Sequence, residues 1–262
     1  QRIMEVLYLY PQGVYGEFAG IFATTLMAFL MFGSFLKVSG AGDFFVNLAS
    51  SLLGNVRGGT AKVAIIASSF FGMINGSPVA NAASVGAITI PLMKSAGYKA
   101  HFAGGVEAVA STGGTLSPPV MGVAAFIMMD FLNVSYATIM VAAALPAFLY
   151  YLALFFEVDF EAARVGMRGL PRTGLPSLKK TLWEGWIYAL PIAALLFFML
   201  GPQYSAETSG IYSIIVLALA TFLVKQKRMG PAKLRDALVG TTRGISEVTF
   251  AMAIAGILSA TF

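Results

Sequence analysis

The chain has 262 residues, of which 58% are hydrophobic and only 11% are charged, whereas a soluble domain carries roughly a quarter charged residues. This composition predicts an all-α polytopic membrane protein, and the formal net charge of +5 lies in short clusters between apolar runs, which argues against nucleic-acid binding. With no cysteine and one histidine, the sequence excludes disulfides, thiolate metal sites and multi-histidine metal clusters.

Residues 1–62 are predicted to form N-terminal scaffold helices. Residues 18–36 are uncharged and long enough to cross a membrane, and Lys37 follows them. Beyond a short turn, Asp43 favours a new helix N-terminus. Whether the segment at residues 41–56 crosses the membrane or lies in its interface is left open by the sequence.

Residues 63–94 contain the most informative apolar run, which has no formal charge between Lys62 and Lys94. The residues that would interrupt a helix lie at its centre: Asn75, Gly76, Ser77 and Pro78. Each half would be only about 18 Å long, too short for a hydrocarbon core of about 30 Å. We therefore predict a re-entrant helical hairpin that enters and leaves by the same face, with its polar tip inside the membrane.

Residues 99–130 form a second apolar run that is interrupted as well. A glycine pair and a proline pair fall within residues 111–119, where they would unwind a helix. Its two ends differ in charge, with Lys99 at one and Asp130 at the other. We predict a broken transmembrane helix, that is, a crossing helix with an unwound waist.

The remaining segments alternate between apolar spans and basic connections. We predict a crossing helix at residues 134–157, a cytoplasmic loop at 158–182, and two scaffold helices with a basic cytoplasmic loop at 183–245. Residues 246–262 are predicted to be the truncated start of a second repeat.

The distribution of lysine and arginine predicts the orientation. Residues 157–180 and 225–243 are rich in basic side chains: Arg164, Arg168, Arg172, Lys179, Lys180, Lys225, Lys227, Arg228, Lys233, Arg235 and Arg243. The opposite connections, at residues 130–135 and 201–210, carry none. By the positive-inside rule the rich connections are cytoplasmic. Lys62 lies on the cytoplasmic side as well only if the hairpin enters and leaves the membrane by the same face.

Several motifs follow one another in a recognisable order: Gly54-Asn55-Val56-Arg57-Gly58-Gly59, Phe70-Phe71-Gly72-Met73-Ile74-Asn75-Gly76-Ser77, Val79-Ala80-Asn81-Ala82-Ala83-Ser84, Ile90-Pro91-Leu92-Met93, and Gly113-Gly114-Thr115 with Pro118-Pro119. In order and spacing they resemble the large membrane subunit of TRAP transporters. Residues 104–122 and those from 144 onward resemble the branch in which small and large subunits are fused. That branch is paired with TAXI-type solute-binding proteins.

The resemblance implies an elevator-type inverted-repeat transporter, each repeat contributing a hairpin and a broken helix. It implies sodium as the coupling ion, no organic cofactor, and an extracytoplasmic or periplasmic solute-binding protein that delivers a small organic anion. It also implies small-subunit helices upstream and a multi-pass location in the lipid bilayer of a bacterial or archaeal cytoplasmic (inner) membrane. We accordingly expect this sequence to be part of a longer chain.

Sodium favours several oxygen ligands, and neutral oxygens suit it in an apolar medium. The predicted substrate- and ion-binding residues lie at the two helix breaks: Asn75, Gly76, Ser77, Pro78, Asn81, Ser111, Thr112, Gly113, Gly114, Thr115, Ser117 and Pro118. The predicted sodium ligands among them are Ser77, Asn81, Thr112, Gly113 and Thr115. The alternative is that the glycines merely permit close helix packing.

Glu107 is the acid that lies well inside the second apolar run, and an intramembrane carboxylate is functional by default. It could be a proton site, or it could hold the geometry of the waist through hydrogen bonds. His101 lies near the predicted cytoplasmic edge. It is six residues from Glu107, so these two side chains do not form a local pair on a helix.

Two other classes of function compete with a transporter. A membrane hydrolase would need a catalytic motif, yet no G-x-S-x-G or H-E-x-x-H pattern occurs, so we expect no enzyme activity. An ion channel or a scaffold subunit of another membrane complex remains the alternative. Dicarboxylates, keto acids and amino acids are all compatible substrates.

Overall fold

The computed structural model describes residue 20, residues 22–224 and residues 228–261, and these ranges are helical without a strand. The predicted all-α fold is confirmed for them. Residues 1–19 of the predicted N-terminal scaffold, 225–227 of the predicted basic loop and Phe262 lie outside the described residues.

A sharp elbow joins the first helices. The π-helix η1 (Phe22–Leu26) leads into α3 (Met27–Val38), and α4 (Ala41–Leu53) is bent from that direction by 67°. Gly40 permits the turn because its φ of +99° is rarely adopted by residues with a side chain. Lys37, expected to follow the first helix, instead lies in its last turn, where a cation suits the carbonyl end.

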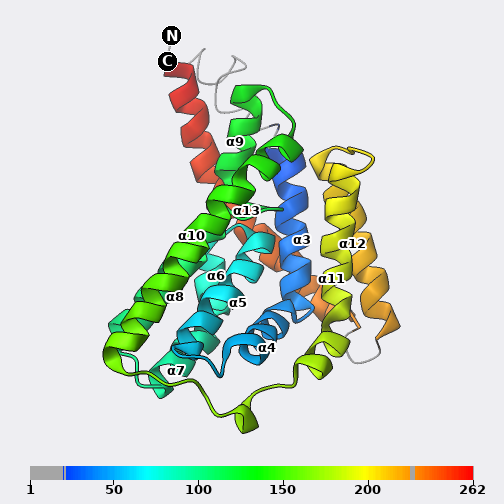
Figure 1. Cartoon of the computed structure of the whole chain (residues 1–262). Helices are drawn as coiled ribbons and strands as arrows, with labels where there is room; N and C mark the ends of the chain where they lie inside the picture. Colours follow the sequence, from blue (N-terminus) through cyan, green and yellow to red (C-terminus); the bar gives the residue numbers. More distant parts are fainter. Residues whose placement is uncertain (1–19, 21, 225–227, 262) are drawn as a thin grey trace.

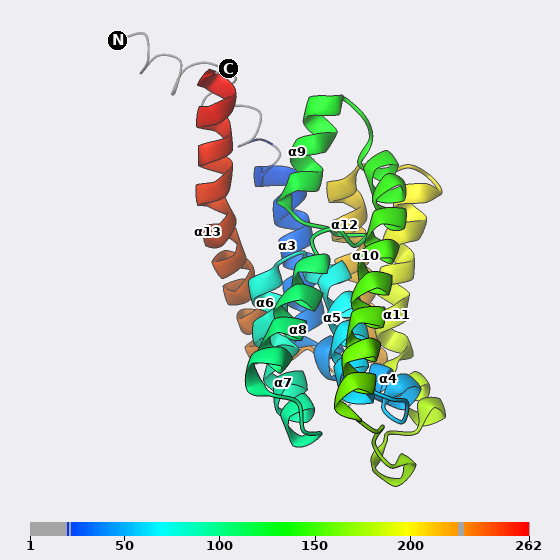
Figure 2. The same cartoon turned by 60° about the vertical axis from the view of Figure 1, so that its left-hand side comes forward.

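The predicted hairpin consists of two antiparallel arms, one a continuous helix and the other divided into two helices. Its first arm is α5 (Gly59–Asn75), and its return arm is divided into α6 (Pro78–Ser84) and α7 (Gly86–Ser95). The first arm begins before Val63, where we predicted the start, because Gly58 turns the chain with a φ of +65°. The two arms pack on each other, and the turn between them lies between the two ends of the molecule (Figure 2).

The second apolar run is also interrupted. It consists of α8 (Ala100–Gly113) and α9 (Val123–Leu132), separated by turns and irregular backbone. α8 packs against α5, α6 and α7, so the helix before the interruption lies directly on the hairpin.

Helix α10 (Tyr136–Val165) is longer than predicted and absorbs the start of the expected loop at 158–182. The added turns carry charges that form ion pairs. Asp159 forms ion pairs with Arg57 and with the buried Lys62, whose Nζ lies 2.5 Å from Oδ1 of Asp159. Glu161 pairs with Arg164 one turn later at 2.7 Å.

Lys62, which a re-entrant hairpin would place on the cytoplasmic side, has a buried side chain. Its side chain is only 6% exposed, and its Nζ also lies 4.6 Å from the centroid of the Phe155 ring. An ammonium group is stable at such a place because a carboxylate and an aromatic face replace water around it.

Three further helices complete the chain. α11 (Leu178–Leu200) follows the 3-10 turn η2 (Arg172–Gly174), and α12 (Ala206–Leu223) packs against it. α13 (Pro231–Thr261) begins well before residue 246, so much of the predicted basic loop at 225–243 is helical. A proline at the first helical position explains that start, because its missing N–H would have no intrahelical partner.

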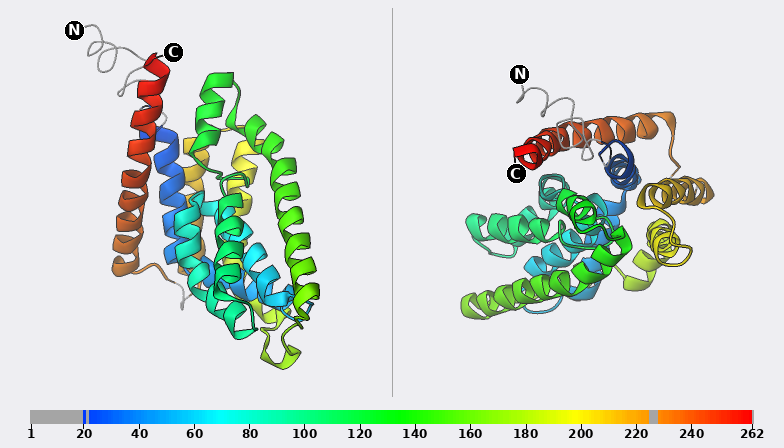
Figure 3. Two further views of the ribbon diagram at one scale, coloured as in Figure 1. Left: turned by 90° about the vertical axis from the view of Figure 1, so that its left-hand side faces the viewer. Right: turned by 90° about the horizontal axis from the view of Figure 1, so that it is seen from above.

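The helices pack around α3 and α5. α13 lies along α3, while α11 and α12 lie on the side away from α8 and α10 (Figure 3). Rings from three helices form the core near α9, with Phe126 and Tyr136 stacked at 4.7 Å and Phe29 5.5 Å from Phe126. The α4 and α7 helices lie at one end of the molecule and α9 at the other (Figure 1).

Among the described residues, three helical segments are long and apolar enough to cross a membrane: Tyr136–Val165, Arg172–Leu200 and Ala206–Leu223. The bent pair formed by α3 and α4 would be a fourth if it counts as one span. The predicted multi-pass membrane class is therefore supported.

We expect Asp159→Asn to lower the midpoint of thermal unfolding, because Lys62 would keep a buried charge without its carboxylate partner. The double variant K62M/D159N should recover much of the loss. Glu161→Gln, which removes the pair with the exposed Arg164, is the matched control and should stay close to wild type. Thermal unfolding of the detergent-solubilised protein tests this, and an unchanged midpoint for Asp159→Asn would contradict it.

Candidate functional site

The hairpin tip is a tight turn that admits no side chain at Gly76. This residue has a φ of +59°, and a Cβ built on it would lie 1.8 Å from the carbonyl oxygen of Met121. Ser77 then caps α6, its hydroxyl accepting from the Ala80 N–H at 3.3 Å, with Pro78 in the first turn. The Asn75 side-chain oxygen accepts from the Ser77 N–H at 2.8 Å, which fixes the turn.

The waist of the broken helix lies directly against this tip. The Val120 N–H donates to the Met73 carbonyl at 3.0 Å, a backbone hydrogen bond between the two interruptions. One turn deeper, a Cβ on Gly72 would lie 2.6 Å from the Cα of Gly114. The two helix breaks therefore meet backbone to backbone, which only glycine allows at this distance.

Asn81 supplies an unpartnered oxygen beside this contact. Its side chain is fully buried, and its Nδ2 donates to the Ser68 carbonyl at 2.8 Å. The same Nδ2 lies 3.1 Å from where a Gly72 Cβ would be, which puts the amide next to the Gly72–Gly114 contact. Among the described residues, Oδ1 of Asn81 has no hydrogen-bond partner. A buried acceptor without a donor is unfavourable unless a cation or water satisfies it.

The waist hydroxyls are already used as donors. Thr112 donates to the Ala108 carbonyl at 2.8 Å, and Thr115 donates to the Thr112 carbonyl at 2.9 Å. A hydroxyl that donates keeps oxygen lone pairs that can face a cation. The Thr115 side chain lies close to Gly122, itself near the Gly76 carbonyl, so Thr115 and the hairpin tip belong to one neighbourhood.

Not every predicted site residue reaches that neighbourhood. Ser117 and Pro118 line a largely apolar cavity of about 580 Å³ between α5 and α10, and the Ser117 hydroxyl donates to the Gly113 carbonyl at 3.0 Å. Ser111 points to Glu107 instead, at 3.1 Å. The hairpin tip, Asn81, Thr115 and the glycine pair therefore lie together. Ser111, Ser117 and Pro118 lie apart from them.

Glu107 is a buried carboxyl group surrounded by hydroxyls. Oε1 accepts from Ser68 at 2.7 Å, and Oε2 accepts from Thr89 at 2.5 Å. Gly86 makes room for it, because a Cβ there would lie 2.9 Å from Cγ of Glu107. These contacts join α5, α7 and α8, which favours the interpretation that Glu107 holds the geometry around the waist.

Sequence reasoning missed the groups that satisfy the freed backbone. Tyr150 and Tyr151 of α10 donate to the carbonyls of Val109 and Ala110 at 2.8 and 3.1 Å. The Tyr136 hydroxyl donates to the Pro119 carbonyl at 3.2 Å and also to that of Val120. Tyrosines within an otherwise apolar span are the signal that could have found them, because a buried phenol needs a partner.

Within the part of the chain that the structure describes, no three histidine, cysteine or acidic side chains gather where they could hold a metal ion. His101 is exposed at the end that carries α7. The cation site of neutral oxygens that the residue types suggest stays a prediction.

We expect Gly114→Ala to lower stability by about 1–3 kcal/mol, the usual range for overpacking, because the new methyl group would meet the backbone of Gly72. Gly104→Ala is the matched control, because nothing lies within 4 Å of a Cβ there. Thermal unfolding of both variants separates the effect of packing from the effect of helix propensity. Equal unfolding midpoints for Gly114→Ala and Gly104→Ala would show that the two breaks do not touch.

Comparison with known proteins gives one family. Residues 4–262 match the family described as the tripartite ATP-independent periplasmic transporter, DctM component. A C4-dicarboxylate TRAP transporter large permease protein of Pseudomonas aeruginosa is 27% identical over 237 residues, covering 86% of this chain and 54% of that protein.

Two sialic acid transporters are also similar. The TRAP transporter permease protein SiaT of Haemophilus influenzae is 31% identical over 195 residues, covering 72% of this chain and 31% of that protein. The large permease protein SiaM of Vibrio cholerae is 29% identical over 206 residues, covering 77% and 48%. The chain thus spans about half, or less, of the length of these relatives.

Proposed function

Because the chain belongs to the DctM component family of tripartite ATP-independent periplasmic transporters, we propose that it is the permease part of a sodium-coupled secondary transporter that imports small organic anions. Its relatives carry the names of transporters for C4-dicarboxylates and sialic acid, which makes carboxylates the substrate class we infer.

This proposal depends on one observation: two interrupted helices meet beside a buried oxygen, Oδ1 of Asn81, that has no partner within the described part of the chain. Irregular backbone survives at membrane depth only where protein or a water-filled cavity surrounds it. Here α5 and α8 both end at the contact, and the carbonyl ends of helices carry partial negative charge. Transporters bind substrates and coupling ions at such breaks.

Sodium fits the residues that this neighbourhood offers. Oδ1 of Asn81 is available as a neutral ligand, and Ser77, Thr112, Thr115 and the Gly113 carbonyl are the further oxygens that we propose would hold the ion. A bound sodium ion would supply the positive charge that attracts a carboxylate and would link import to the sodium gradient.

The wider assembly follows from the same proposal. We infer an elevator mechanism in which α5 to α8 move as part of a transport domain against scaffold helices that include α3, α11 and α12. A TAXI-type or other extracytoplasmic solute-binding protein would deliver the substrate, and small-subunit helices fused upstream would extend the scaffold. The membrane would be the cytoplasmic (inner) membrane of a bacterium or archaeon.

The re-entrant path of the hairpin is tested by labelling, for which the cysteine-free sequence provides a clean background. Cysteines at Arg57 and Lys94, one before α5 and one in the last turn of α7, should both react with an impermeant reagent from the cytoplasmic side. A cysteine at Asn133, after α9, should react from the other side. Labelling of the first two positions from opposite faces would contradict the hairpin.

Sodium binding is tested with Asn81→Ala. We expect the sodium concentration for half-maximal uptake into proteoliposomes to rise about tenfold, since loss of one ligand worth roughly 1.4 kcal/mol changes affinity tenfold. Ser84→Ala is the matched control, because its hydroxyl is also buried without a partner on α6 but is not among the proposed ligands. An equal sodium dependence in both variants would remove Asn81 from the ion site.

A further inference from the structure

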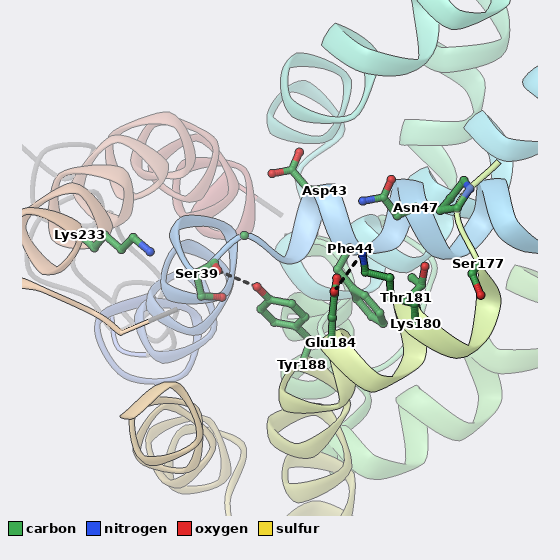
Figure 4. Close-up of a pocket in the computed structure, with 12 residues that line it drawn as sticks. Ser39, Asp43, Phe44, Asn47, Ser177, Lys180, Thr181, Glu184, Tyr188 and Lys233 are labelled. Carbon is green, nitrogen blue, oxygen red and sulfur yellow. Dashed lines mark hydrogen bonds and ion pairs between the residues drawn. The ribbon is translucent and has the colours of Figure 1, made fainter. Parts of the chain in front are cut away.

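A second cavity lies far from the helix breaks, at the end of the molecule that carries α4 and α7. It has a volume of about 510 Å³ and is formed by the α3–α4 elbow, the first turns of α11 and the start of α13 (Figure 4). Its base is fixed by the Tyr188 hydroxyl, which donates to the Ser39 carbonyl at 2.7 Å. The transport chemistry proposed above does not use this cavity.

The cavity is lined by equal numbers of acidic and basic side chains. Asp43 and Glu184 are the acids, and Lys180 and Lys233 are the bases. Lys180 faces Glu184 with Nζ 3.9 Å from Oε1, while Asp43 comes from α4 and Lys233 from α13 (Figure 4). Lys180 and Glu184 are 76% and 58% exposed, so their mutual attraction is weak and both side chains are accessible to a ligand. A zwitterionic ligand would match both signs of charge.

An apolar surface continues from this cavity along α11. It is lined by Leu182, Trp183 and Trp186, and it shares Ser177 and Lys180 with the charged cavity. Trp183 is 81% exposed, the highest fraction among the exposed large hydrophobic side chains of the described residues. The axial spacing on α11 is about 4.5 Å between Lys180 and Trp183, and again between Trp183 and Trp186.

This sequence of groups follows the profile of a lipid leaflet. Ammonium groups lie at the headgroup level, tryptophans favour the interface below it, and apolar side chains continue into the hydrocarbon. A water-soluble zwitterion would use the charged cavity but would leave the tryptophan surface bare. A phospholipid would cover both.

We propose that the cavity and the tryptophan surface together form a binding site for a phospholipid with a primary-amine headgroup, of the phosphatidylethanolamine type. Lys180 and Lys233 bind the phosphate, and Asp43 and Glu184 accept hydrogen bonds from the ammonium group. The acyl chains lie over Trp183 and Trp186. A choline headgroup has no N–H to donate, and a purely anionic headgroup would be repelled by the two carboxylates. The bound lipid would tie the α3–α4 elbow to α11 and α13.

The two tryptophans are the only ones in this sequence, so they can report the site directly. The full-length protein is placed in phosphatidylcholine nanodiscs that contain increasing fractions of a lipid with brominated acyl chains. Brominated phosphatidylethanolamine should quench tryptophan fluorescence half-maximally at a mole fraction at least fivefold lower than brominated phosphatidylcholine or phosphatidylglycerol. The W183F/W186F variant gives the background from any other tryptophan.

Single variants assign the headgroup contacts. Asp43→Asn and Lys180→Gln should each bring the phosphatidylethanolamine curve to that of phosphatidylcholine. Asp236→Asn is the matched control, because Asp236 is an exposed acid on α13 that lines neither surface, and it should keep the preference.

Five results would overturn the proposal. Equal quenching by all three lipids would indicate ordinary contact with bulk lipid, and stronger quenching by phosphatidylglycerol would indicate an anionic lipid. No quenching by any lipid would show that a protein partner covers the tryptophans. Full competition by soluble glycerophosphoethanolamine would show that the ligand is not a lipid. A preference that survives in both Asp43→Asn and Lys180→Gln would also contradict it.

Discussion

The contact between the backbones of Gly72 and Gly114 is the constraint on which the centre of this structure depends. A helix that stops inside an apolar protein leaves N–H and carbonyl groups that need partners, at several kcal/mol for each one left in lipid. Here the two stops satisfy each other, through the hydrogen bond from Val120 to Met73 and through the close approach that the glycines allow.

The surrounding helices complete this arrangement. α10 contributes tyrosine hydroxyls to carbonyls on both sides of the waist, and Glu107 ties α8 to both arms of the hairpin through Ser68 and Thr89. With so many polar groups paired, Oδ1 of Asn81 stands out as a buried acceptor without a donor among the described residues. A largely paired frame around an open neutral oxygen is the kind of preorganised place that a weakly held cation needs.

Much of this fold could be predicted from the sequence, because the helix breaks and apolar spans depend on residues that are close together in the chain. Gly76, Pro78 and the glycine pair at the waist are residue types that favour helix ends when they cluster, and the apolar runs indicate the membrane class. The resemblance to the TRAP large subunit is confirmed by the family match. The fused small subunit, the TAXI pairing and the sodium ligands stay predictions.

Other features depend on contacts between distant segments, and these the sequence could not supply. The burial of Lys62 requires Asp159 from another helix, 97 positions along the chain. That pairing also explains why α10 runs through charged residues that resemble a loop when read alone. Likewise, nothing local marks Ser68 and Thr89 as partners of Glu107, or separates Ser117 from the other waist hydroxyls.

In the function proposed here, the two helix breaks meet at a cation site made of neutral oxygens. It is tested most directly by the thermal unfolding of the purified full-length protein in sodium, potassium or choline chloride at equal ionic strength, without substrate. A ligand that binds only the folded state raises stability by about 2.7 kcal/mol at one hundred times its Kd. We predict that sodium raises the unfolding midpoint above that in potassium and choline, and that Asn81→Ala makes this difference clearly smaller, because it weakens sodium binding about tenfold. Equal midpoints in the three salts, or a sodium effect of unchanged size in Asn81→Ala, would rule out this site.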